Sequence, residues 1–245
     1  MATRRSKWKS GITKVYKDRL VTYGVEQDNI VRNFSYEEMV FLLLTGKRPT
    51  PVQAAMLRAV IVSHCSHGIT GQSTLAVRMG ADTRATLFNS VLGGFMVGSG
   101  PTHQGSLEPA MQELIAARES GDPAAYTREQ LAKDRRLVGF GHRYHSFDPR
   151  ARVHMELCDA HGYLGPYVQT ARTMDDVLRR KKGIRMNIEA SGGSILLDMG
   201  FPVEAAHLII LIGRGPMLAA AYLERLAEKK RPFQKIVVID AFEED

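Results

Sequence analysis

The chain has 245 residues, of which 44% are hydrophobic, and a formal net charge of +7 at pH 7. This length and apolar content can bury a substantial core, so we expect an ordinary globular protein with one large domain, or one domain carrying a smaller lobe. No apolar run reaches the roughly 18 residues of a membrane span, and the basic residues 1–9 lack the apolar core of a secretory signal. The two cysteines form neither a disulfide framework nor a metal-ligand spacing. These features predict a cytoplasmic protein.

The positive charge would attract a polyanion, which is either nucleic acid or a phosphorylated or carboxylated metabolite. The basic residues fall into separate clusters at 135–136, 179–185 and 229–231 rather than along one stripe. This distribution favours a small anionic ligand over a continuous groove for nucleic acid.

Two capping boxes mark the first helices. Ser35 and Glu38 form one box before an apolar run that ends at Gly46. Thr50, followed by proline, forms the second box with Gln53 and opens a helix that continues to residue 63. We therefore predict two short helices in this part of the chain.

Helical periodicity continues through most of the remaining chain. It predicts helices over residues 73–79, 83–97, 106–119, 149–161, 173–180 and 203–228, the last interrupted at 213–216. Alternating strand patterns are confined to residues 14–23 and 235–239, and the polar stretch 119–134 is expected to be a connection. The fold class predicted is all-α.

Two histidines lie on glycine-rich turns thirty-nine residues apart. His103 stands in the segment 100–105, and His142 stands in the segment 139–143, which runs on into Asp148-Pro149-Arg150. Glycine and proline allow sharp turns that bring the backbone close to a ligand. Because imidazole donates, accepts or carries charge near neutral pH, these turns are candidate catalytic segments.

Several short motifs follow one another along this chain. They are Ser35-Tyr36-Glu37-Glu38 with Leu42-Leu43-Leu44 and Gly46, Ser66-His67-Gly68, the two histidine turns with Asp148-Pro149-Arg150, Asn187-Ile188-Glu189, Arg214 and Arg231. Each motif is short, but so many in one order are hard to obtain by chance. Together, over residues 11–231, they resemble the citrate synthase superfamily, and especially its short members known as citryl-CoA lyases.

The resemblance implies a helical citrate synthase-like fold that forms a homodimer with shared active sites. It implies a large domain formed by residues 1–107 and 197–245 and an inserted small domain, residues 108–196, that closes over the substrates. The activity implied is cleavage of citryl-CoA to acetyl-CoA and oxaloacetate, or the reverse condensation of an acyl-CoA with a 2-oxo acid. Coenzyme A enters as a thioester substrate, and no permanent cofactor, metal, nucleic acid or membrane is implied.

The resemblance also implies roles for individual residues. His103 donates to the thioester oxygen as the acyl-CoA enolises, His142 polarises the ketone of the 2-oxo acid, and the acid at Glu189 is the base. The carboxylates of the substrate are held by His67, Arg150, Arg214 and, from the partner chain, Arg231.

These residue types suit that chemistry. An enolate is a strong base in water, so a neutral imidazole donor in a closed site stabilises the charge as it develops. A guanidinium pairs with a carboxylate through two parallel hydrogen bonds, and three such groups offset much of the desolvation of a di- or tricarboxylate.

The sequence departs from the family pattern at two places. Glu189 stands where the family has an aspartate, and one added methylene moves the carboxylate by about 1 Å, which is enough to change a rate on the order of a hundredfold. Asp198 is an alternative base. The spacing from His142 to Arg150 is one residue shorter than usual.

Coenzyme A carries several phosphate charges, and basic residues flank the motifs where the family binds its nucleotide. The predicted CoA-binding residues are Arg136, Gly139, Phe140, Gly141, Arg143 and Lys182.

Three alternatives stay open. A metalloenzyme is suggested by His64 and His67, one helical turn apart, with His103, His142 or His145 completing a shell. A non-catalytic protein that senses CoA or citrate is suggested by Glu189. A nucleic-acid binder is suggested by the net charge and disfavoured by the lack of a recognisable reading helix.

Overall fold

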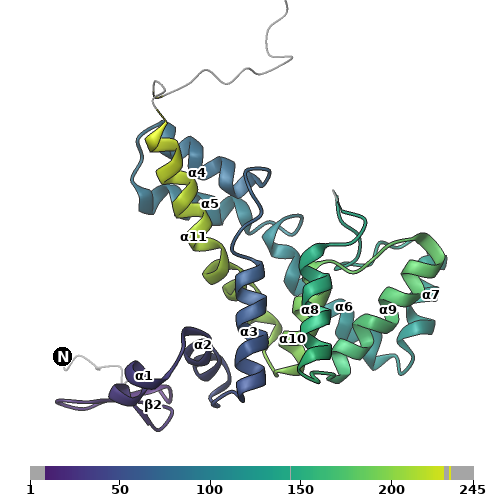
Figure 1. Ribbon diagram of the computed structural model, residues 1–245, viewed down its shortest axis with the longest axis horizontal. Coiled ribbons are helices and arrows are strands. Elements are labelled where there is room, and N and C mark those ends of the chain that lie inside the picture. The colour runs from purple at the N-terminus through teal and green to yellow at the C-terminus, as the bar shows by residue number, and fades with distance from the viewer. Residues whose placement is uncertain (1–8, 144, 229–231, 233–245) are drawn as a thin grey trace, which may run out of the picture. The chain divides into compact units, whose positions relative to one another are not determined.

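The computed structural model describes residues 9–143, 145–228 and 232. Helices make up most of this part of the chain, with one small sheet near its beginning, and the predicted all-α class is confirmed (Figure 1). The chain divides into two compact units, one formed by Met1–Val60 and Ala110–Ala205 and the other by Ile61–Pro109 and Ala206–Asp245. These units are defined by packing within the chain. The expected division into a large domain (1–107 and 197–245) and a closing small domain (108–196) concerns movement and stays a prediction.

The first unit begins with a small antiparallel sheet. Its strands are β1 (Thr13–Val15), β2 (Leu20–Thr22) and β3 (Val25–Glu26), in the order β1-β2-β3. Lys14 pairs with Val21, so the single strand expected over residues 14–23 is a hairpin instead. The amide of Tyr16 donates to the carbonyl of Arg19 across the turn at 2.9 Å. The other predicted strand, 235–239, lies outside the described residues.

Three helices follow the sheet: α1 (Gln27–Asn33), α2 (Tyr36–Thr45) and α3 (Pro51–Ser63). Both predicted capping boxes are confirmed. The amide of Ser35 donates to Glu38 Oε2 at 2.8 Å, and the amide of Thr50 donates to Gln53 Oε1 at 2.9 Å. Reciprocal bonds from the Glu38 and Gln53 amides to the two hydroxyls complete each box, so both helix starts are set by local sequence.

The rest of the first unit consists of helices around one apolar core. They are α6 (Leu107–Glu119), most of which belongs to this unit, α7 (Pro123–Ala132), α8 (Pro149–Ala160), α9 (Pro166–Lys182), α10 (Ile188–Asp198) and the short 3-10 helix η2 (Val203–Ala205). The core includes Leu114, Phe140, Met174 and Leu178, all nearly inaccessible to solvent. Helix α10 packs against both α8 and α9.

Two of these helices were not expected. The stretch 119–134 contains α7, because Asp122 accepts hydrogen bonds from the amides of Ala124 and Ala125 and Pro123 occupies the first helical position. Helix α10 was missed because it is buried around most of its circumference and carries Gly192-Gly193, so neither periodicity nor propensity indicates it.

The second unit is built on α4 (Gln72–Asp82), α5 (Leu87–Gly98), the 3-10 helix η1 (Gln104–Ser106) and α11 (Ala206–Ala227), with α11 packed along α4 and α5 (Figure 1). Its core is formed by Val77, Ala81, Leu218 and Tyr222. Pro216 lies inside α11, which continues through the interruption expected at 213–216.

One described helical stretch, Val203–Ala227, is long and apolar enough to cross a membrane by length and composition, criteria that the core helix of a soluble protein also meets. Arg214 and Arg225 on this helix are buried, at 3% and 7% exposure. Arg225 forms an ion pair with Asp82, and Arg214 donates to the carbonyl of His64 at 2.7 Å. Because buried charges need protein partners of this kind, α11 has the character of a core helix.

Candidate active site

The loop that carries His142 is tied to the segment before α10. The amide of Asn187 donates to the carbonyl of Gly139 at 2.9 Å, and the amide of Gly141 donates to the carbonyl of Arg185 at 2.8 Å. Gly139 has φ +89°, and a Cβ there would lie 2.9 Å from Ala190 Cβ, so the close approach requires glycine. This pairing brings His142 to the start of α10.

Glu189 is the second residue of α10 and is half-buried. Asn187 caps the helix, because its side-chain oxygen accepts from the amides of Glu189 and Ala190 at 3.0 and 3.4 Å. The Asn187 amide group also donates to the carbonyl of Gly141 at 2.9 Å. Glu189 therefore lies in the first turn of α10, at the positive end of the helix, and Asn187 bonds this turn to the histidine loop.

Asp148 joins α8 to α10. Its buried carboxylate accepts from Arg150 Nε and Nη2 at 2.9 and 2.8 Å, and from the amide of Ile188 at 3.1 Å. Burial alone would raise the pKa of this carboxyl. The Arg150 guanidinium, together with the hydrogen bonds from the backbone amides of Arg150 and Ile188, brings the pKa below its usual value. Asp148 is thus ionised, and it holds one edge of the Arg150 guanidinium beside Glu189 and His142.

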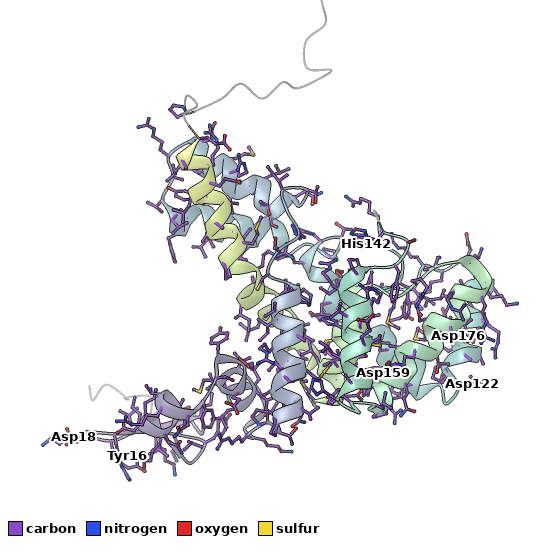
Figure 2. The ribbon with its side chains drawn as sticks, viewed as in Figure 1. Tyr16, Asp18, Asp122, His142, Asp159 and Asp176 are labelled. Carbon is purple, nitrogen blue, oxygen red and sulfur yellow. The ribbon has the colours of Figure 1, made fainter. Side chains whose placement is uncertain are left out.

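His142 is half-buried and lies beside the first turn of α8, at the opposite end of that helix from Asp159 (Figure 2). The amide of His145 donates to His142 Nδ1 at 3.1 Å, so in the neutral ring the proton is on Nε2. Burial lowers the pKa of His142, outweighing the attraction of Asp148, and the ring of His145 stacks on it at 4.5 Å. The geometry makes His142 a neutral Nε2–H donor.

The first unit therefore brings together three of the predicted site residues, His142, Arg150 and Glu189. Hydrogen bonds connect the 139–142 loop, the start of α8 and the start of α10. Asp148 links α8 to α10, and Asn187 links α10 to the loop. Both stand inside sequence motifs noted above, but only the structure assigns their roles.

His103, in the second unit, precedes η1 and is half-buried. Its Nε2 lies 3.0 Å from Ser73 Oγ, which also accepts from Gln104 Nε2 at 3.2 Å. A hydroxyl donates one hydrogen bond and accepts two, so Ser73 Oγ can bond to His103 Nε2 in either neutral tautomer of the ring. The tautomer in which Ser73 donates to Nε2 is the one that leaves an Nδ1–H as a donor. Ser73 had no signal in the sequence that marked it as part of a site.

The ring of His67 lies 5.5 Å from the ring of His103, measured between centroids. Its Nδ1 is 3.1 Å from the carbonyl of Gly68, which can only accept, so Nδ1 carries the proton. Burial, the charge of Arg214 and the neighbouring His103 lower the pKa of His67 to about 4. Its buried Nε2 has no hydrogen-bond partner among the described residues and is the kind of atom that a ligand satisfies.

Arg214 projects from α11 into the same part of the second unit, as its charge on His67 indicates, and is 3% exposed. The second unit therefore brings together His67, His103 and Arg214. Arg231, the remaining predicted carboxylate ligand, lies outside the described residues.

The predicted CoA-binding residues fall into two groups. Arg136, Arg143 and Lys182 are exposed, and Gly139, Phe140 and Gly141 form the paired loop described above. The Phe140 side chain is 4% exposed and belongs to the core. The ring of Phe140 is therefore not available to a ligand, and Gly141 is the half-buried residue of the three.

Two other sequence-based alternatives can be compared with the structure. Asp198 accepts from the amides of Tyr167 and Val168 at 2.8 and 2.9 Å, so its carboxylate caps α9. Among the described residues, no group of three or more histidine, cysteine, aspartate and glutamate side chains is arranged to hold a metal ion.

The family model and curated relatives that match this chain carry the description citrate synthase. A family model described as citrate synthase, C-terminal domain, matches residues 12–237. The citrate synthase of Haloferax volcanii is 26% identical over 210 residues, covering 84% of this chain and 54% of that protein. Citrate synthase 1 of Mycobacterium tuberculosis is 31% identical over 204 residues, covering 75% of this chain and 47% of that protein. The chain thus spans about half the length of these curated relatives.

Among solved structures, the citryl-CoA lyase of Hydrogenobacter thermophilus is similar over nearly its whole length. The TM-score is 0.87 and the identity 28%, and the match covers 97% of this chain and 94% of that one. The predicted citrate synthase-like fold is confirmed.

A Gly71→Ala substitution tests the position of His67. A Cβ at residue 71 would lie 2.0 Å from His67 Cε1, so the ring has to move toward solvent. We expect the pKa of His67 to rise from about 4 toward 6.5, its ordinary value, as burial is relieved. Histidine NMR titration measures this change. Gly93→Ala is the control, because a Cβ there meets no atom within 4 Å; a wild-type titration in Gly71→Ala would contradict the geometry.

Proposed function

The chain belongs to the citrate synthase family, and on that basis we propose that it cleaves citryl-CoA to acetyl-CoA and oxaloacetate. The observation that carries the proposal is the match to a citryl-CoA lyase over 94% of that protein's length, combined with the two sets of site residues. One set is His142, Arg150 and Glu189, and the other is His67, His103 and Arg214. The same groups serve the reverse condensation by microscopic reversibility.

His142 acts at the oxygen of the tertiary alcohol. The Glu189 carboxylate accepts the hydroxyl proton, and the Nε2–H of His142 donates to the alkoxide that remains and then to the ketone oxygen that replaces it. The amide of His145, at 3.1 Å from Nδ1, keeps the proton on Nε2 throughout. A neutral donor whose proton position is set by the backbone costs no reorganisation during the reaction.

His103 and Glu189 act on the departing acetyl group. As the carbon-carbon bond breaks, the electron pair passes into the thioester enolate, and the Nδ1–H of His103 stabilises its oxygen. In this role His103 has its proton on Nδ1, and its Nε2 accepts from the Ser73 hydroxyl, whose oxygen is 3.0 Å away. Glu189, which holds the proton taken from the hydroxyl, then gives it to the methylene carbon, which completes acetyl-CoA.

The carboxylates of the oxaloacetyl half pair with Arg150, Arg214 and Arg231, the last from a partner chain, and with His67. Asp148 occupies the Nε and one Nη of Arg150, which leaves the far edge of the guanidinium for the substrate. CoA binds through the charges of Arg136, Arg143 and Lys182 and through the backbone of residues 139–141. No metal or permanent cofactor takes part.

Two further properties belong to the proposal. We assign the protein to the cytoplasm, where its free cysteines, Cys65 and Cys158, stay reduced. We also assign a homodimer, with α5 in the interface. Phe88, Leu92 and Met96, spaced four residues apart on α5, are 71%, 44% and 77% exposed, which is unusual for large apolar side chains that form one stripe.

Variants of the reacting groups test the function. His103→Ala and His142→Ala should each lower kcat for citryl-CoA cleavage by about 10²- to 10⁴-fold, the range for a lost oxyanion donor or acid-base group. Glu189→Gln should abolish exchange of acetyl-CoA methyl protons with solvent. Product mass spectrometry and proton NMR measure both effects.

Tight binding of citryl-CoA without product formation would instead favour a non-catalytic CoA- or citrate-binding protein. Condensation of an acyl-CoA with a 2-oxo acid, but no cleavage of citryl-CoA, would favour a synthase. Glu189→Asp is the matched variant: because it moves the carboxylate by about 1 Å, it should cost on the order of a hundredfold in kcat if the site is built for glutamate.

Citrate binding should take up a proton at His67. The free ring is neutral at pH 7, with a pKa of about 4, and its Nδ1–H is engaged by Gly68, so Nε2 can donate to a carboxylate only after protonation. Calorimetry in buffers of different ionisation enthalpy should show up to about one proton bound per site, and His67→Ala should remove this uptake. Equal heats in all buffers would mean that His67 accepts from a ligand hydroxyl.

Substitutions that introduce charged side chains on α5 test the proposed dimer. Phe88→Glu combined with Met96→Glu should convert the protein to a monomer, because two carboxylates cannot be desolvated in an apolar interface. Light scattering coupled to gel filtration measures the mass. Val31→Glu on α1, at a site that is 72% exposed, is the control; a dimer that persists in the α5 variant would remove this face from the interface.

A further inference from the structure

His154 is a buried histidine that the proposed mechanism does not use. It lies on α8, four residues after Arg150, and is 1% exposed. Its partner is Ser191 on α10, which is fully buried and lies two residues after Glu189. A buried imidazole and hydroxyl require a full set of hydrogen bonds, where an apolar pair of similar volume would require none.

The hydrogen bonds of this pair are satisfied with a neutral ring. His154 Nδ1 lies 2.9 Å from Ser191 Oγ, and the ring also bonds to the carbonyl of Ala59. A carbonyl only accepts, so the nitrogen facing Ala59 donates, and Nδ1 of the neutral ring needs a donor. The Ser191 hydroxyl is that donor at 2.9 Å, in preference to its longer contact of 3.3 Å with the carbonyl of Ile188. Burial lowers the pKa of His154 to about 4, so this arrangement is the same throughout the neutral pH range.

The pair adds a polar link between α8 and α10 to one formed by Asp148, which caps α8. The Asp148 link is the bond from the Ile188 amide to Asp148 Oδ2, at 3.1 Å. Along α8, Arg150 lies between Asp148 and His154; along α10, Glu189 lies between Ile188 and Ser191. Apolar packing holds the two helices together, and directional hydrogen bonds add a fixed register along them. The two links lie on either side of Arg150 in α8 and of Glu189 in α10.

Helix α10 needs such support because Ser191 is followed directly by Gly192 and Gly193. Each glycine in a helix interior is about 1 kcal/mol less favourable than alanine. The first turn, which carries Glu189, is therefore attached to a locally weak helix. The bond from Ser191 to α8 holds that turn from outside.

We propose that His154 and Ser191 are positioning residues that hold Glu189 in register with Arg150 for proton transfer. This inference rests on the proposed function. Neither residue touches the substrate. They fix the position of Glu189 relative to the substrate carboxylate that Arg150 binds. A displacement of about 1 Å there lowers the rate of the chemical step on the order of a hundredfold.

The experiment uses three variants of the full chain and one control. Ser191→Ala removes the hydroxyl and keeps a strong helix former, His154→Leu removes the ring nitrogens, and His154→Gln restores a donor and an acceptor. Thr127→Val is the control, since Thr127 is equally buried on α7 and its hydroxyl bonds only to the carbonyl of Pro123, at 2.7 Å. The readouts are kcat and KM for citryl-CoA, the rate of methyl-proton exchange, and thermal stability.

Ser191→Ala and His154→Leu should lower kcat and proton exchange together by about 10- to 100-fold, with KM changed less than about threefold. His154→Gln should recover most of the lost rate. Thr127→Val should lose comparable stability at unchanged kcat. If His154→Leu does not fold, Ser191→Ala decides the question.

Wild-type kcat and exchange in Ser191→Ala, or losses no larger than those of Thr127→Val, would overturn the inference and leave the proposed function standing. A wild-type protein that neither cleaves citryl-CoA nor exchanges methyl protons would overturn the proposed function, and this inference with it.

Discussion

One buried carboxylate, that of Asp148, holds the candidate active site of the first unit together. It caps α8, pairs with the guanidinium of Arg150 and accepts the amide of Ile188 at the start of α10. A buried charge is tolerated only when it is paired and hydrogen-bonded, so these partners are required together rather than singly. Through Asn187, the same arrangement extends to the loop of His142. Asp148 thus positions the Arg150 guanidinium and the start of α10 directly, and Asn187 and backbone bonds hold the His142 loop to that same helix start.

The chemistry of the site depends on where the imidazole protons are. A backbone amide leaves the proton of His142 on Nε2, and a backbone carbonyl leaves that of His67 on Nδ1. Burial lowers the pKa of both rings, so each is neutral in the free protein. In the proposed reaction His67 takes up a proton to bind a carboxylate, whereas His142 stays a neutral donor of fixed orientation. Such a donor suits a reaction in which negative charge appears on oxygen and then disappears, because a permanent positive charge would hold the intermediate too strongly.

Much of the fold was predictable from local sequence, but not all of it. The capping boxes at Ser35 and Thr50 predicted two helix starts correctly, because capping is a contact between residues three apart. Helix α7 was missed although Asp122-Pro123 is a good start signal, since the same residues also signal a turn. Helix α10 was missed because its burial on nearly every side removes the periodicity that identifies a surface helix.

For the site, the sequence by itself determined the residue types and their order, and through the motifs that contain His103, His142 and Glu189 it determined the family. The tertiary structure decided which neighbours each of them meets. Ser73 is thirty residues from His103, and Ser191 is thirty-seven residues from His154. Pairs so distant in the chain leave no periodic or spacing signal. Their hydrogen bonds exist only because helices packed in a core bring buried polar atoms within 3 Å of one another and leave them no water as an alternative partner.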